Sequence, residues 1–210
     1  MAVCWLPVSL AVCIFVSLIV VALLPSHNKA YFNHFINEHQ MLDLHSLEIL
    51  IEDKKPVAIG DCGLDYIKVK DRNKQRYFFD EQVALATRFN LPLIIHSVQA
   101  TEDVIDLLKS NSKSRGVIHA YSGTLQEAKI LMKMNFLFGF SHNLSNPHTY
   151  KLHDIVKFLP LESILIETDD HKNPDELIQV AERVARIKKI TVNQVIQQCD
   201  QNARTLFNLA

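Results

Sequence analysis

The sequence predicts an α/β protein in which short parallel strands lie between helices, arranged as a doubly wound sheet or a (β/α) barrel. Two observations carry this prediction. From Pro56 onward, short apolar runs alternate with helical stretches, and this order of elements is typical of parallel sheets. The apolar runs also lack the alternation expected of a strand with one solvated face, which indicates burial on both faces.

Each element follows from its local pattern of apolar, polar and capping residues. The predicted elements, in order, are amphipathic helices within 31–55, a strand at 56–60, a helix over 71–90, a strand at 91–96, a helix opened by Thr101, a strand at 116–121, a helix opened by Thr124, strands at 136–140 and 163–169, and helices over 174–189 and 191–209.

The composition sets the broad class of the protein. Its 210 residues are 48% hydrophobic and 21% charged, enough to bury a sizeable core as one domain. The formal net charge is -1, so no bulk positive field would hold a long polyanion. The four cysteines form no CxxC pair, which argues against a disulfide framework and favours a reducing compartment.

The N-terminal segment has a different character. Residues 2–24 carry no charge, and a stretch of that length can cross a bilayer as a helix. A cleavable signal is disfavoured, because no basic residue precedes the apolar run. We therefore expect a cytoplasmic protein, with anchoring in a membrane through residues 2–24 as the alternative.

Four of the predicted strands end in a side chain that can bind a divalent metal: Asp61, His96, His119 and Asp169. Taken singly, such a histidine is more often an interior hydrogen-bonding residue, and such an aspartate often caps a helix. Four occurrences at equivalent places favour a shared metal site, because the carboxyl ends of parallel barrel strands converge on one face. Histidine with carboxylate suits Zn, Mn, Fe or Mg and does not select among them.

The motifs around these residues resemble those of the TatD deoxyribonuclease family. The segment 60–66, GDCGLDY, resembles the family's G-E-x-G-L-D-Y, and His96-Ser97 resembles its H-S-R. The segment 119–123, HAYSG, is similar to H-C-F-S-G, and 167–169, ETD, to E-T-D-x-P. The resemblance extends over about three quarters of the chain.

The resemblance implies a distorted (β/α)₈ barrel that hydrolyses phosphodiester bonds in DNA with two divalent metals. It places Asp61 as the metal-bridging carboxylate, and His96 and His119 as ligands of one metal. Asp169 takes the position of the catalytic carboxylate beside the attacking water, also a metal ligand. The implied cofactor is Mg, Mn or Zn, one or two ions, and the implied partner is DNA as substrate, with no stable protein partner.

The sequence departs from the family pattern at several places. The H-x-H pair of the family's first strand occurs nowhere in the chain, and the three strands that should precede Pro56 are not recognisable. Asp61 stands in place of glutamate, Val98 in place of the H-S-R arginine, and His171 in place of proline. We therefore divide the chain into an apolar segment 1–25, a transmembrane helix or the product of a shifted reading frame, and a hydrolase domain 26–210 whose barrel is incomplete at its N-terminus.

Three functions are compatible with this pattern. The leading one is a TatD-type deoxyribonuclease that cleaves DNA in the manner of a 3′–5′ exonuclease. The second is a truncated homologue that is catalytically impaired or inactive. In one form of this hypothesis, the protein is also attached to a membrane. The third is a metal-dependent hydrolase of another ester or amide, since one His/His/Asp site can activate water for several substrates.

Overall fold

The computed structural model describes residues 41–145, 149–168 and 175–209. The predicted apolar segment 1–25 and Asp169 lie outside these ranges. Within them, no helix is long and apolar enough to span a bilayer. Five strands form one parallel sheet: β1 (Ile59–Asp65), β2 (Leu93–Val98), β3 (Gly116–Ile118), β4 (Leu137–Phe140) and β5 (Ile164–Ile166).

The order of the strands decides between the two predicted architectures. Neighbours in the sheet follow the sequence, β1-β2-β3-β4-β5, without the reversal that marks a doubly wound fold. A parallel sheet that keeps winding in one direction is the arrangement of a (β/α) barrel, so the barrel prediction is confirmed.

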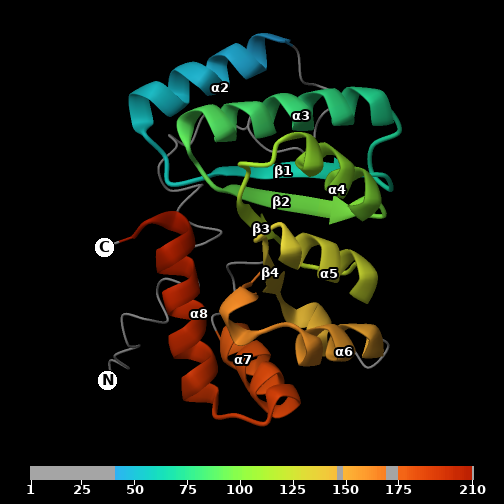
Figure 1. Cartoon of the computed structure of the whole chain (residues 1–210), viewed down its shortest axis with the longest axis vertical. Coiled ribbons are helices and arrows are strands. Elements are labelled where there is room, and N and C mark those ends of the chain that lie inside the picture. Colours follow the sequence, from blue (N-terminus) through green and yellow to red (C-terminus); the bar gives the residue numbers. More distant parts are fainter. Residues whose placement is uncertain (1–40, 146–148, 169–174, 210) are drawn as a thin grey trace.

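Helices connect the strands and cover the sheet (Figure 1). In Figure 1, α2 lies outside α3, which lies against β1, while α7 and α8 lie at the opposite end of the molecule. The α-helices are α2 (Met41–Lys54), α3 (Arg72–Phe89), α4 (Thr101–Ser110), α5 (Leu125–Lys133), α6 (Tyr150–Phe158), α7 (Asp175–Lys188) and α8 (Val192–Phe207).

Side chains at the helix ends explain the boundaries of the longer helices. Asp71 caps α3 by accepting a hydrogen bond from the backbone N–H of Lys74 at 3.0 Å, and Asn90 ends it in the left-handed region. Thr124 and Thr191 open α5 and α8 with capping boxes. The predicted helices over 71–90 and 191–209 are confirmed to within two residues.

The first strand differs from its prediction. It does not end at Gly60 but continues to Asp65, through residues that were expected to form a polar loop. The register to β2 shifts between Ile59 and Cys62, so the strand tolerates polar and glycine residues that interrupt an apolar run. Asp61 therefore lies inside β1 rather than after it.

The two faces of the sheet have different partners. Leu93 and Ile95 of β2 belong to a large cluster that packs beneath the surrounding helices. Ile94, which points to the other face, belongs to a smaller cluster with Val117 of β3, Leu165 of β5 and the C-terminal turns of α8. The end of α8 thus covers the amino half of this second face.

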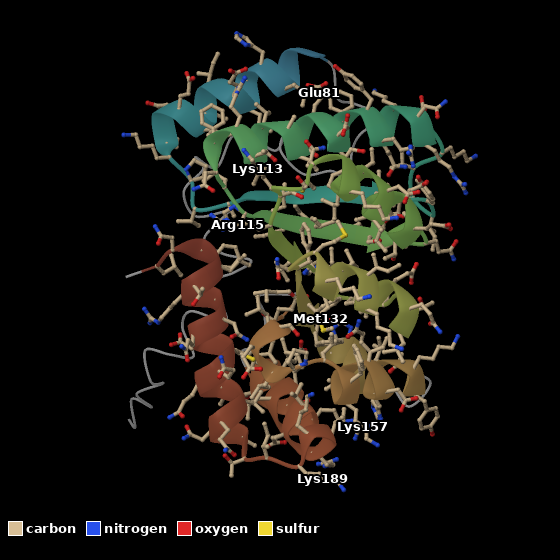
Figure 2. The ribbon with its side chains drawn as sticks, in the orientation of Figure 1. Glu81, Lys113, Arg115, Met132, Lys157 and Lys189 are labelled. Atoms are coloured by element: carbon tan, nitrogen blue, oxygen red, sulfur yellow. The ribbon has the colours of Figure 1, made fainter. Side chains whose placement is uncertain are left out.

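Arg115 fixes that end of the molecule. Its guanidinium donates to the carbonyl oxygens of Leu206 at 2.6 Å and Asn90 at 2.9 Å, joining the residue before β3 to α8 and to the end of α3. Figure 2 shows Arg115 between the β2 side of the sheet and the C-terminal end of α8. The amino ends of the strands are closed in this way, which leaves the carboxyl ends for a site.

Candidate metal centre

Asp61, His96 and His119 meet at the carboxyl half of the sheet. Each offers one ligand atom, and these atoms all lie within 4.8 Å of one another. His96 is two residues beyond Ile94 of β2, and His119 is two residues beyond Val117 of β3. Because residues two apart along a strand share a face, both rings lie on the face that α8 covers near the amino ends of the strands. The structure thus brings together three of the four residues predicted to bind metal.

The geometry of this cluster fits one divalent ion. A metal about 2.0–2.2 Å from two ligand atoms holds them at most about 4.4 Å apart. The observed upper limit of 4.8 Å is close to that span, so adjustments of a few tenths of an ångström would complete the coordination. Two imidazoles and one carboxylate suit Zn, Mn or Fe, and do not exclude Mg.

A buried carboxylate orients His119. Oε1 of Glu167 lies 2.8 Å from Nδ1 of His119 and also accepts the backbone N–H of Ala120 at 2.6 Å. The Glu167 side chain is 3% exposed and that of His119 13%, so water competes little for the contact. With Nδ1 engaged, Nε2 of His119 remains as the nitrogen available to a metal.

A glycine makes this contact sterically possible. Glu167 follows β5 and His119 follows β3, so the strand β4 lies between them. A Cβ atom at Gly139 of β4 would lie 2.4 Å from Oε2 of Glu167. The missing side chain at Gly139 therefore leaves the space through which Glu167 reaches across β4.

A second carboxylate holds His96. Oδ2 of Asp65 lies 3.2 Å from Nε2 of His96, and its other oxygen accepts the backbone N–H groups of Ile67 and Lys68 at 2.9 and 2.8 Å. Burial acts to raise the pKa of Asp65, but the Lys68 N–H and the His96 ring outweigh it. The net pKa of Asp65 lies below its ordinary value, so the carboxylate is charged at neutral pH.

The residues after β1 keep Asp65 in place. The side chain of Gln75, on α3, is buried, and its Oε1 accepts the backbone N–H of Asp65 at 2.7 Å. Its Nε2 donates to the carbonyls of Asp65 and Val69, each at 3.1 Å. A polar residue inside the core thus ties the turn after β1 to the first helix of the barrel.

Each candidate histidine ligand is therefore backed by a carboxylate, an arrangement that fixes ring orientation and raises the basicity of the remaining nitrogen. The two rings lie near each other, with centroids 6.3 Å apart and planes inclined by 29°. In the sequence, Asp65 and Glu167 stand within the motifs at 60–66 and 167–169, where nothing local indicates a role for them. Their role depends on contacts across strands, which residue spacing alone does not reveal.

Two other side chains that could bind metal, those of Cys62 and His142, are not members of the cluster. Cys62 is buried, its thiol donates to the carbonyl of Ile94 at 3.3 Å, and burial raises its pKa, which are properties of a packing residue rather than of a nucleophile. His142 is exposed on a short 3-10 helix and is not part of the described cluster.

Comparisons with known proteins agree with the site. A family model described as TatD related DNase matches residues 18–208. The chain is 34% identical over 181 residues to YabD of Bacillus subtilis, described as an uncharacterized metal-dependent hydrolase, with 80% of this chain and 71% of that protein covered.

Solved structures share the fold. YjjV, a TatD homologue from Escherichia coli K12, superposes with a TM-score of 0.78 at 27% identity, covering 85% of this chain and 75% of that one. A TatD family hydrolase from Entamoeba histolytica has a TM-score of 0.74 at 22% identity, with 85% and 73% of the two chains covered. The second likeness concerns the fold alone.

The chain combines a (β/α) scaffold, a cluster of metal-binding side chains at its carboxyl face and these relatives. Together they define the protein as a metal-dependent hydrolase. Within that class, the chain belongs to the TatD-related DNase family.

Proposed function

We propose that this protein is a metal-dependent phosphodiesterase that removes nucleotides from single-stranded DNA ends, in the manner of a 3′–5′ exonuclease. The observation that carries the proposal is the cluster of Asp61, His96 and His119, with each histidine backed by a buried carboxylate. When bound there, a divalent ion supplies Lewis acidity toward a phosphoryl oxygen and makes water more acidic. The family description, TatD related DNase, supports DNA as the substrate class.

In this proposal, the protein's own residues have distinct roles. Asp61, His96 and His119 hold the ion, while Asp65 and Glu167 keep the two rings oriented. Their fixed hydrogen bonds mean that little reorganisation accompanies metal binding. The low exposure of the four hydrogen-bonded side chains, 3–15%, limits access of bulk water to the hydrogen bonds that hold the rings.

We assign Asp169 as the catalytic carboxylate and as a further metal ligand. Thr168, the residue before it, is buried beyond the carboxyl end of β5, next in sequence to Glu167. A carboxylate that accepts a proton from the attacking water is the group this reaction needs besides the ion. The assignment rests on chain continuity with Glu167 and on the E-T-D motif.

The test is release of nucleotides from a 5′-labelled single-stranded oligodeoxynucleotide by the purified, metal-stripped chain, resupplied with Mg, Mn or Zn. We expect stepwise shortening only with metal, and its loss in His119→Ala and Asp169→Asn. His45→Ala, which removes an exposed histidine on α2, is the matched control and should retain activity. Activity indifferent to the first two substitutions would contradict the residue assignments.

The descriptions of two relatives are also compatible with another substrate class. YabD and YjjV carry the description metal-dependent hydrolase without a named substrate. A panel of carboxylic esters and amides, assayed beside the oligonucleotide with the same metals, distinguishes a DNA substrate from an ester or amide substrate. Turnover of an ester or amide that depends on His119, with no nucleotide release, would replace the DNase proposal by this alternative.

A further inference from the structure

A cavity of about 470 Å³ is lined by residues at and just after the carboxyl ends of β1, β2 and β3. Its walls include Tyr66, Val98 and Ser122, each of which follows a residue of the site along the chain. Tyr66 comes directly after Asp65, and Val98 is two residues beyond His96. Ser122 is three residues beyond His119. Because an extended chain spans no more than about 3.6 Å per residue, the Cα atom of each wall residue lies within roughly 11 Å of the Cα atom of its site residue.

A planar platform forms one side of this cavity. The guanidinium carbon of Arg72 lies 4.3 Å from the centroid of the Tyr66 ring. The Tyr66 hydroxyl donates to Asp103, whose other oxygen pairs with Arg76, so the ring is held in position. Arg72 is exposed and lines the cavity, which makes its guanidinium accessible to a ligand there.

The charges on the walls select the kind of ligand. Glu102, Asp103 and Glu127 accompany Arg72 around the cavity. Asp103 is engaged by the Tyr66 hydroxyl and Arg76, and Glu127 accepts the backbone N–H of Thr124 in the capping box of α5. These three carboxylates would repel a phosphate group inside the cavity, whereas they can accept hydrogen bonds from amino groups. The stacked guanidinium and phenol groups bind flat rings.

We propose that this cavity is a subsite for the nucleobase of a nucleotide flanking the scissile phosphate, with Arg72 stacked on Tyr66 as its platform. The proposal rests on the proposed DNase function and adds the part of the substrate that is recognised. The volume of the cavity falls within the range typical of small-ligand sites. Bases of any kind stack on aromatic and arginine side chains. The stacking contact therefore recognises a base without specifying which one.

The test compares three single-stranded oligodeoxynucleotides that share one backbone. One is intact, and the others carry an abasic tetrahydrofuran unit at one or the other nucleotide flanking the scissile bond. For the wild type we expect KM to rise about tenfold on at least one abasic substrate. Arg72→Met should raise KM on the intact substrate by a similar factor and leave KM on that abasic substrate unchanged.

Two further variants sharpen the result. Arg72→Lys keeps the charge but not the planar group, so it should behave like Arg72→Met; recovery of wild-type KM would instead indicate a phosphate contact and overturn the proposal. Arg186→Met, an exposed arginine on α7, is the matched control. Equal constants for the wild type on all three substrates would also overturn the subsite, while the DNase function stands. Failure to cleave any of them counts against the DNase function itself.

Discussion

Glu167 holds the ring of His119 from two strands away, with Oε1 2.8 Å from Nδ1. The contact crosses β4 at Gly139, where no side chain intervenes. Because Asp65 holds His96 in a comparable way, the orientation of both candidate ligands is set by the sheet rather than by loops. This relationship leads to specific expectations about metal affinity and stability.

Removing the negative charge from Glu167 should weaken metal binding without unfolding the protein. We predict that Glu167→Gln lowers the affinity for Mn or Zn by about 10–100-fold, because the amide is a poorer partner for the histidine Nδ1–H. Isothermal titration calorimetry measures the change. Glu162→Gln, an exposed glutamate on the 3-10 helix before β5, should bind metal like the wild type. An unchanged affinity in Glu167→Gln would contradict the positioning role.

Filling the gap at Gly139 should have a related effect. In Gly139→Ala, the new methyl group would lie 2.4 Å from Oε2 of Glu167 and displace the carboxylate. We predict weaker metal binding and a loss of about 1–3 kcal/mol in the free energy of unfolding. Urea denaturation and calorimetry measure the two effects.

A double substitution tests the cause. If the methyl group acts by colliding with the carboxylate, Gly139→Ala should cost much less stability in a Glu167→Ala background, a non-additive result. Equal costs in both backgrounds would mean that the glycine is needed for another reason.

The charge of Asp103 should make stability depend on pH. The hydrogen bond from Tyr66 lowers the pKa of Asp103, and Arg76 lowers it further against the opposing effect of burial. A carboxyl whose folded pKa is depressed contributes stability that is present above the unfolded pKa of about 3.9 and is lost as the pH falls through the folded value. We predict that Asp103→Asn lowers the urea midpoint at pH 7 and that this deficit shrinks toward pH 3.

The matched control for this pH dependence is Asp106→Asn. Asp106 pairs with Lys109 on the exposed side of α4, where ion pairs contribute little. It should change the urea midpoint only slightly at either pH. A deficit in Asp103→Asn that stays constant from pH 7 to pH 3 would show that charge is not its cause.

Asn202 should be important for stability rather than for the site. Its buried side chain donates to the carbonyls of Leu161 at 2.9 Å and Ile164 at 2.8 Å, which tie α8 to the start of β5. We predict that Asn202→Ala lowers the free energy of unfolding by about 2 kcal/mol, because buried carbonyls lose their donor. Gln201→Ala, exposed on the same helix, should have little effect. Equal unfolding midpoints for the two variants would count against this role.

Local signals were sufficient for many elements of the fold. Asp71 and Asn90 mark the ends of α3 because capping depends on adjacent residues, and Thr191 marks the start of α8 for the same reason. The extent of β1 was not predictable, because Gly60 and Asp61 interrupt its apolar run and the strand pairs with β2 again only from Cys62, after a shift in register. Cross-strand pairing is a tertiary property that a local pattern does not contain.

The candidate site was predictable in its ligands but not in their supports. His96 and His119 follow apolar runs in successive units, so the convergence of parallel strands was enough to bring them together. The contact between Glu167 and His119 depends on an empty position on the intervening strand, and residue spacing carries no sign of it. The stacking of Arg72 on Tyr66 likewise joins a helix start to the turn after β1.

The proposed function depends on a divalent ion held by Asp61, His96 and His119. Equilibrium dialysis of the metal-stripped chain against Mn or Zn, followed by elemental analysis, measures this binding most directly. We expect about one ion per chain, with at least tenfold weaker binding in His96→Ala and His119→Ala and unchanged binding in His45→Ala. Binding by the two site variants that equals the wild type, or no binding by the wild type, would contradict this assignment.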